Sequence, residues 1–419
     1  MTSTEDRAQN LRDGGEKGYV GLGILSHRQR ECHHTVWSVT ESLSPAEIAR
    51  YARQMTLPEV GKEGQARLKR ARVLVIGVGG LGSPVASYLA AAGVGTLGIV
   101  DCDAVDLSNL HRQLLYVTSD IGSRKVATAS SRLRALNPNV EVVPFDAELT
   151  RENALEILRD FDLVVDGTDN FRTRYLVNDA CVLLGIPNVY GSVLRFDGQV
   201  TVLAAPNGPC YRCLYPVPPP AGSVPSCAEA GVLSVLPGIV GMLQASEAMK
   251  LILGKGDVLI GRLLLIDALA ARFSDIAIRR DPQCIACGTR TLRELIDYDE
   301  FCAPRGAVNG ARQSVTQITA RELEAWRADR RSLALVDVRE PWEWNLGHIG
   351  GATLLPLGEL ARSAASLDPS VETVVYCHLG TRSQAAAEHL VALGFRRVYN
   401  LAGGIDAWSS DVDPGIPRY

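Results

Sequence analysis

Four cysteines in this chain stand in two pairs whose spacing is typical of metal ligands. Cys210 and Cys213 lie in PCYRC, and Cys284 and Cys287 lie in QCIACG, roughly 70 residues further along the chain. Two such C-x-x-C pairs can close one tetrahedral site of four thiolates, the arrangement that a structural zinc ion prefers. Because the protein would fill all four positions, we expect the ion to have a structural role.

A glycine-rich segment offers a site for phosphate. The apolar run Val73–Ile76 is followed by Gly77, Gly79 and Gly82 at G-x-G-x-x-G spacing and then by an Ala-rich helical pattern. Glycines permit a tight turn at this point, and exposed main-chain amides at a helix N-terminus suit a phosphate group. The segment therefore predicts a bound nucleotide without specifying which one, and a nicotinamide or flavin enzyme is the alternative at this stage.

The residues after the next apolar run favour a triphosphate. Asp101 ends that run, at a place where an acidic side chain usually binds a ribose hydroxyl, and it begins DCDAVDLSNLHRQ. A nicotinamide site does not need the Ser-Asn-x-x-Arg run, whereas a triphosphate needs fixed donors and cations, which Arg112 and Lys125 can supply. Asp169, in VVDGTDN at the end of another apolar run, is a candidate ligand for Mg²⁺.

Cys377 is a candidate nucleophile for sulfur chemistry. It directly follows the apolar run TVVY and begins CHLGTRSQAAAEHL. Successive loop amides and a helix N-terminus would stabilise its thiolate, which could accept a sulfane sulfur and carry a persulfide. A cysteine-phosphatase loop is the alternative, but it separates its Cys and Arg by one residue more than the four between Cys377 and Arg382. The shorter loop favours a sulfurtransferase.

Cys227 follows a Pro-rich stretch, PVPPPAGSVPS, which resists regular structure and is interpreted as a crossover loop. Two roles stay open for this thiol. It can be inert and buried, or it can attack an acyl-adenylate or resolve a later intermediate.

The elements that must position these residues form an α/β pattern. Apolar runs alternate with helical segments, which predicts a doubly wound, Rossmann-like sheet. Ser44, Pro45 and Glu47 form a capping box that opens a helix before the sheet, and this helix carries Arg53. The predicted strands are Val73–Ile76, Leu97–Val100, Val140–Val143, Leu163–Val165 and Pro187–Tyr190, with antiparallel strands near Val200–Ala204 and Leu263–Ile266.

A second, smaller α/β unit follows a stretch rich in Gly, Pro and Asn. Thr319 and Glu322 form another capping box, and strands are predicted at Leu333–Val336, Thr373–Tyr376 and Val398–Tyr399. The expected organisation is a flexible N-terminal extension over 1–39, a nucleotide-binding domain over 40–298, a linker over 299–314 and a smaller domain over 315–419.

Composition sets the broad class. With 419 residues, 46% hydrophobic and 21% charged, the chain is typical of a soluble protein of two or three domains, and a net charge of −4 gives no reason to expect nucleic acid. The N-terminal residues are polar, without a signal peptide, and the uncharged stretch Ala230–Ser246 is interpreted as a buried helix and its lead-in rather than a membrane span. The ten cysteines form no secreted framework, so we expect a cytoplasmic protein.

Taken together, GVGGLG, DCDAVDLSNLHRQ, Lys125, TDN and the cysteine pairs resemble the ubiquitin-activating-enzyme-like adenylyltransferases of ThiF type, over roughly residues 41–290. The likeness is to the molybdopterin-synthase and thiamine-thiazole adenylyltransferase branch. It implies a Cys₄ zinc site and a homodimer in which Arg53 reaches the partner's triphosphate. It also implies that ATP is surrounded by Gly80, Asp101, Ser108, Asn109, Leu110, His111, Arg112, Lys125, Asp169 and Asn170.

The remaining residues resemble a rhodanese domain over about 315–419, on VDVREPWEWNLGHIGGA and the loop CHLGTR. Asp337 and Arg339 are expected to structure the active loop. The pairing of domains resembles fused adenylyltransferase–sulfurtransferases that charge small ubiquitin-like sulfur carriers. It implies that Mg-ATP adenylates the C-terminal Gly-Gly carboxylate of a carrier. A Cys377 persulfide, loaded by thiosulfate or by a cysteine desulfurase persulfide, then gives the carrier thiocarboxylate.

The pathways that such a likeness implies are molybdopterin, thiamine or cysteine biosynthesis, or tRNA thiolation. An alternative is the activation of a ubiquitin-like protein for conjugation through a Cys227 thioester, which would leave Cys377 without a use. A non-catalytic scaffold would leave the arginines and Asp169 unexplained.

Overall fold

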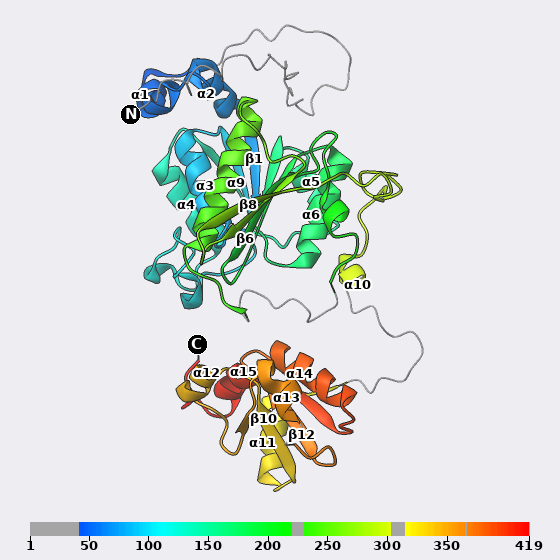
Figure 1. The fold of residues 1–419 in the computed structure, drawn as a ribbon. Helices are drawn as coiled ribbons and strands as arrows, with labels where there is room; N and C mark the ends of the chain where they lie inside the picture. The colour runs from blue at the N-terminus through cyan, green and yellow to red at the C-terminus, as the bar shows by residue number, and fades with distance from the viewer. Residues whose placement is uncertain (1–41, 220–229, 303–314, 365–366, 419) are drawn as a thin grey trace, which may run out of the picture.

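The structure, a computed structural model, describes residues 42–219, 230–302, 315–364 and 367–418. The predicted N-terminal extension, Cys227 and most of the predicted linker lie outside these residues. The first part of the described chain forms a large α/β unit and the last part a smaller one (Figure 1).

The larger unit is built on an eight-stranded sheet with the order β3-β2-β1-β4-β5-β6-β7-β8. The strands from β3 to β5 in this order pair in parallel, and β6, β7 and β8 continue the sheet with antiparallel pairing. This is the predicted doubly wound sheet with antiparallel pieces. Its strands are β1 (Arg72–Ile76), β2 (Thr96–Val100), β3 (Glu141–Phe145), β4 (Leu163–Asp166), β5 (Asn188–Leu194), β6 (Asp197–Leu203), β7 (Arg262–Asp267) and β8 (Arg272–Ala277).

Two apolar cores lie on the two faces of this sheet, because successive side chains of a strand point to opposite faces. Val73 and Val75 of β1 pack into the core beneath α3, α4 and α9, whereas Leu74 and Ile76 pack into the core beneath α5 and α6. Figure 1 shows these two helical layers on either side of the strands. The helices are α1 (Pro45–Met55), α2 (Gly61–Arg70), α3 (Gly82–Ala92), α4 (Lys125–Leu136), α5 (Ala154–Leu158), α6 (Phe171–Leu184), α7 (Tyr211–Leu214), α9 (Leu236–Leu253) and α10 (Tyr298–Cys302).

Two predictions about helices are confirmed. Ser44 and Glu47 form the predicted capping box at the start of α1, with Ser44 N donating to Glu47 Oε2 at 2.7 Å. Helix α9 is long and apolar enough to cross a membrane by length and composition, but it packs against α3, β5 and β6 as a core helix. One boundary differs from expectation, because residues 299–302 of the predicted linker belong to α10, which packs against α6.

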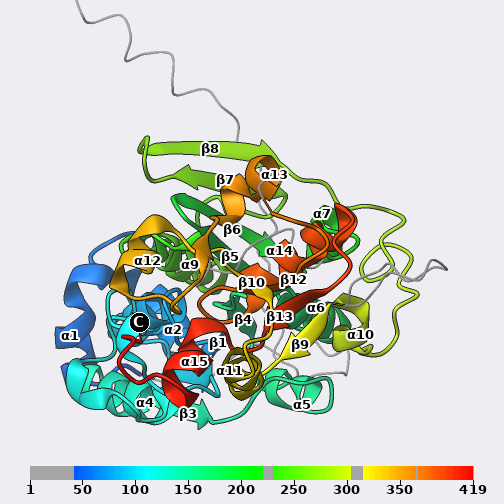
Figure 2. The same ribbon diagram turned by 90° about the horizontal axis from the view of Figure 1, so that it is seen from below.

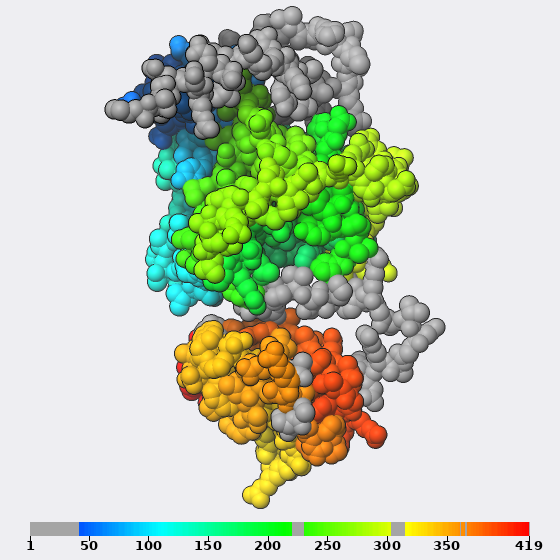
Figure 3. Space-filling model, in the orientation of Figure 1, coloured from blue at the N-terminus to red at the C-terminus, as the bar shows by residue number. Residues whose placement is uncertain are grey.

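The smaller unit is a five-stranded parallel sheet with the order β11-β10-β12-β13-β9. Thr319 and Glu322 form the predicted capping box of α11. Figure 3 shows the two units as two bodies, and Figure 2 shows β8 at the outer edge of the large sheet. The elements of the smaller unit are β9 (Thr316–Ile318), α11 (Ala320–Ala328), β10 (Leu333–Asp337), α12 (Pro341–Leu346), β11 (Thr353–Leu354), α13 (Leu360–Ser363), β12 (Glu372–Tyr376), α14 (Thr381–Ala392), β13 (Val398–Leu401) and α15 (Gly404–Asp411).

Candidate functional site

A cavity of about 280 Å³ opens at the carboxyl ends of β1, β2 and β4. This is the edge where ligands bind in open α/β sheets, since the strand order reverses there. The turn between β1 and α3 lines part of this cavity. Gly77 has φ of +81°, and a Cβ on Gly82 would lie 1.8 Å from the Gly77 carbonyl oxygen. The helix can therefore approach the strand only with glycine at these two positions, and this close approach brings the N-terminus of α3 to the cavity.

Gly80, in the turn after β1, and Asp101, directly after β2, both line this cavity. A Cβ on Gly80 would lie 3.1 Å from Pro237 Cβ and 3.6 Å from Arg112 Cδ, so a larger residue would crowd the cavity wall. Asp101 Oδ2 accepts a hydrogen bond from Val78 N, and its Oδ1 accepts one from Asp103 N, both at 2.9 Å. Burial raises the pKa of Asp101, against the lowering influence of Lys125. These bonds fix the carboxylate at the end of β2, where it can accept from a ribose.

Two predicted cations also line the cavity. The buried Lys125, the first residue of α4, donates from Nζ to Asp103 Oδ2 at 2.7 Å. Arg112 donates to the main-chain oxygen of Ser108 at 2.9 Å. The cavity lining therefore includes one ammonium and one guanidinium in addition to the carboxylate of Asp101.

The rest of the predicted nucleotide set lies at different distances from this cavity. Asp169 and Asn170 line it, and Asn170 also caps α6 by accepting from Thr173 N at 2.9 Å. Ser108, Asn109, Leu110 and His111 form the adjoining turn and do not belong to the cavity lining. Arg53 is exposed on α1 and also lies outside the lining.

The cavity includes a charged residue that the sequence reasoning did not select. Arg174 is 8% exposed, lines the cavity and donates to the main-chain oxygen of Thr168 at 3.0 Å. Its guanidinium lies 5.5 Å from the ring centre of Tyr190. Arg172, in the same turn of α6, lines the cavity as well. Two arginines in the first turn of a helix oppose the helix dipole, and this unusual placement is the signal that could have found them.

The four paired cysteines meet in space, as predicted. Their Sγ atoms all lie within 4.8 Å of one another, and three of the residues are buried. Cys210 and Cys284 Sγ are 3.5 Å apart, and Cys213 and Cys287 Sγ are 3.3 Å apart. Sulfurs on a tetrahedral zinc ion lie about 3.8 Å apart, so this cluster fits one metal ion after a small expansion. Asp281 N donates to Cys213 Sγ at 3.3 Å, as amides do around metal-bound thiolates.

Cys377 lies between β12 and α14 in the smaller unit, as predicted. It is 2% exposed, and its Sγ accepts from Gly380 N at 3.1 Å and from Ser383 Oγ at 3.4 Å. Gly380 takes a φ of +97°, which turns its amide toward the sulfur. The sulfur therefore faces a loop amide and a hydroxyl at the N-terminus of α14, a kind of position in which reactive cysteines occur.

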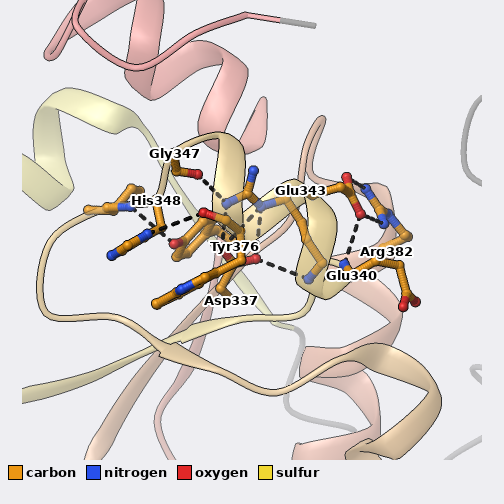
Figure 4. A network of polar contacts seen from close by, with 10 residues as sticks. Asp337, Glu340, Glu343, Gly347, His348, Tyr376 and Arg382 are labelled. Atoms are coloured by element: carbon orange, nitrogen blue, oxygen red, sulfur yellow. Dashed lines mark hydrogen bonds and ion pairs between the residues drawn. The ribbon is translucent and has the colours of Figure 1, made fainter.

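A buried polar network lies at the carboxyl ends of β10 and β12 (Figure 4). Arg339 and Asp337 form a fully buried ion pair at 2.7 Å, and Arg339 also donates to the Gly347 carbonyl at 2.8 Å. The hydroxyl of Tyr376, the residue before Cys377, accepts from Ile349 N at 3.2 Å. The pair therefore fixes the segment that packs beside the end of β12.

Comparisons with known proteins agree with both halves of this description. The model of the ThiF family matches residues 51–286, and that of the rhodanese-like domain matches residues 319–411. A probable adenylyltransferase/sulfurtransferase MoeZ of Mycobacterium tuberculosis is 47% identical over 90% of this chain and 97% of its own length. The sulfur carrier protein adenylyltransferase of Thermus thermophilus is 60% identical over 62% of this chain and 98% of its own.

More distant proteins extend the comparison. The adenylyltransferase and sulfurtransferase MOCS3 of Anopheles gambiae is 42% identical and covers 94% of this chain and 92% of its own. Among solved structures, MccB of E. coli covers 59% of this chain and 74% of its own, with a TM-score of 0.52 and 22% identity. That last likeness, at 22% identity, concerns the fold alone.

Proposed function

This chain belongs to the ThiF family and carries a rhodanese-like domain after its ThiF region. From that premise we propose a mechanism by which the chain activates a sulfur carrier protein and transfers sulfur to it. It is an adenylyltransferase and a sulfurtransferase, like its relatives over most of its length. The observation that carries the proposal is the pairing, in one chain, of a cation-lined cavity at strand ends and a cysteine held by a loop amide.

In the first half-reaction, the carrier's C-terminal Gly-Gly carboxylate attacks the α-phosphate of ATP in the cavity, and pyrophosphate leaves. No general base is needed because the nucleophile is already ionised. Arg112 and Lys125 would stabilise the negative charge that spreads over the phosphates, and Asp101 would hold the ribose. Asp169 would hold Mg²⁺, which supplies charge neutralisation at the phosphates. Asn170 and Gly80 would shape the nucleotide site.

Arg53 and the turn that contains Ser108, Asn109, Leu110 and His111 would complete the site around the nucleotide. Because Arg53 is exposed on α1 and outside the cavity lining, the proposal requires a homodimer in which it reaches the partner's triphosphate. The Cys₄ cluster would bind a structural Zn²⁺ ion. Through its four thiolates this ion would connect the segment after β8 to α7. Four thiolates in one site suit a reducing compartment, in line with a cytoplasmic enzyme.

In the second half-reaction, the Cys377 persulfide attacks the carbonyl of the acyl-adenylate and AMP leaves. The product is an acyl disulfide between the carrier and Cys377. A thiolate then attacks Cys377 Sγ, so that the S–S bond breaks and the carrier leaves as a thiocarboxylate. We assign this resolving step to Cys227, which gives a Cys227–Cys377 disulfide that cellular thiols must reduce before the next turnover.

The test is the intact mass of a Gly-Gly-ended sulfur carrier after incubation with the protein, Mg-ATP and thiosulfate. We expect one carboxyl oxygen to be replaced by sulfur. With Cys377→Ala we expect ATP–pyrophosphate exchange to persist and the thiocarboxylate to disappear. A stable carrier thioester on Cys227 would instead support conjugation, and loss of exchange in Cys377→Ala would contradict two separate half-reactions. Carriers of the molybdopterin, thiamine, cysteine and tRNA-thiolation pathways would be compared in the same assay.

A further inference from the structure

The guanidinium of Arg382, the basic side chain that ends the Cys377 loop, is bound to a carboxylate. Its two terminal nitrogens donate to the two oxygens of Glu343 on α12, both at 2.7 Å (Figure 4). The side chains are 14% and 3% exposed. A bidentate pair with this little exposure is strong and holds both groups in one geometry. Glu343 Oε2 also accepts from Glu340 N at 2.9 Å, which anchors the carboxylate to the first turn of α12.

This pairing offsets the charge of the one basic residue, Lys or Arg, in the loop. Arg382 is the only Lys or Arg in CHLGTR. Burial lowers the pKa of His378, against raising influences from Asp406 and Glu343. The neighbouring charges are themselves paired, Asp406 with Arg418 at 2.7 Å and Asp337 with Arg339 at 2.7 Å. A sulfur donor that approaches the loop therefore meets the main-chain amide that binds Cys377 Sγ, and an apolar rim.

The apolar rim is contributed by the loop itself. Leu379, two residues after Cys377, is 52% exposed, and α12, whose Glu343 pairs with Arg382, carries the exposed Trp342. Such a rim suits the surface of another protein better than it suits a small, strongly hydrated anion.

Sulfur donors differ in the charge that they bring to this loop. With thiosulfate, the Cys377 thiolate attacks the outer sulfur, the S–S bond breaks, and sulfite leaves with the bonding electron pair as a dianion. With a persulfide, the thiolate attacks the terminal sulfur, the same kind of bond breaks, and a thiolate leaves with a single charge. Neither exchange needs an external oxidant or reductant. The first places more negative charge beside the loop, and that charge needs a cation to stabilise it.

We propose that Glu343 is a specificity-determining residue that withholds the charge of Arg382 from the donor, so that Cys377 takes sulfur from a protein persulfide in preference to thiosulfate. This inference rests on the proposed role of Cys377 and adds the class of donor. Glu343 acts through Arg382 and does not touch the reacting sulfur.

The test is the Glu343→Gln variant of the full chain, assayed for sulfur transfer to cyanide from thiosulfate and from glutathione persulfide. The amide keeps the shape and one acceptor but frees the charge of Arg382. We expect the ratio of kcat/KM for thiosulfate to that for the persulfide to rise about tenfold, the effect of one new charge-assisted contact. Glu372→Gln is the matched control, because Glu372 makes a bidentate pair with Arg331 at the other end of β12. We expect it to leave the ratio unchanged.

A second variant shows whether a change in the donor ratio comes from the freed charge of Arg382. Adding Arg382→Met to Glu343→Gln should return the donor ratio to that of the parent chain, because the freed charge is then gone. An unchanged ratio in Glu343→Gln, or a gain that persists in the double variant, would overturn the inference while leaving sulfur transfer intact. If neither donor places a persulfide on Cys377 of the parent chain, by intact mass, the proposed function itself fails.

Discussion

The nucleotide cavity and the Cys377 loop both form at the carboxyl ends of parallel strands, yet two arginines of the cavity are bound differently from the two arginines beside the loop. In the cavity, Arg112 and Arg174 donate to main-chain carbonyls, although the lining also includes Lys125 and Arg172, which pair with carboxylates. In the smaller unit, Arg339 and Arg382 each make a bidentate pair with a carboxylate. Phosphoryl chemistry must stabilise charge spread over several oxygens, whereas sulfur exchange moves one charge between sulfurs. The difference in pairing matches this difference in chemistry.

The largest effect that would sharpen this comparison is the loss of a cavity cation. Lys125→Met should lower the rate of carrier-dependent ATP–pyrophosphate exchange about 100-fold, because a preorganised charge at the phosphates is removed. The neighbouring Arg124→Met is the control, since Arg124 pairs with Asp146 on the surface and lies outside the cavity lining. Persulfide loading of Cys377, read by intact mass, should be unchanged in both variants. Equal exchange rates in the two variants would refute the assignment of Lys125 to the phosphates.

Much of the fold could be predicted because the central strands are buried on both faces. Val73–Ile76 and Leu163–Val165 are continuous apolar runs, and each lies within a strand of the structure. Strand β8 could not be found, because all six of its residues are exposed and show no alternation. Strand β3 runs through Pro144 to Phe145, beyond the predicted end at Val143, because an edge strand tolerates a proline.

The candidate site residues could be placed from the sequence where they come shortly after strands. Asp101 directly follows β2 and Asp169 comes soon after the end of β4, so the topology alone brings them to one edge of the sheet. The partners of buried arginines were not predictable in this way. Arg382 and Glu343 are 39 residues apart, and no local pattern says that their side chains turn toward each other. Such pairs depend on how α12 packs beside α14, which is a property of the folded unit.

A second prediction concerns the stability of the larger unit and is smaller in effect on chemistry. Cys284→Ser should remove one ligand of the Cys₄ cluster, abolish the zinc content measured by elemental analysis and destabilise the larger unit by about 4 kcal/mol. The unfolding of this unit would be followed by circular dichroism. Cys102→Ser, at an exposed thiol outside the cluster, is the control.

The same experiment separates the two units, because tryptophan fluorescence reports on the smaller one. Four of the five tryptophans lie there, at positions 326, 342, 344 and 408. Cys284→Ser should leave the fluorescence transition where it is in the parent chain. A cluster that holds no metal would give the parent chain no zinc and no difference from Cys102→Ser, and the structural role would have to be abandoned.

The smallest expected effect concerns the ion pair between Arg331 and Glu372 in the smaller unit. It tests whether this pair makes the stability of that unit depend on pH. The hydrogen bond from Arg331 lowers the pKa of Glu372 below its usual 4.5. The unfolded chain therefore binds a proton at Glu372 at a higher pH than the folded chain does. The pair stabilises the folded state fully above the ordinary pKa of a glutamate, and this contribution is lost as pH falls through the lower, folded-state pKa.

The Glu372→Gln variant has no such pH dependence at this position. The difference in Tm between the parent chain and this variant, read by tryptophan fluorescence, should thus be constant near neutral pH and shrink as the solution is acidified through the titration of Glu372. Arg331 has a half-exposed position, with 36% of its side chain accessible, so water screens the pair and the shift should be small. A Tm difference that stays constant down to the acid limit, or that grows with acidification, would mean that the Arg331–Glu372 pair contributes no proton-linked stability to the smaller unit.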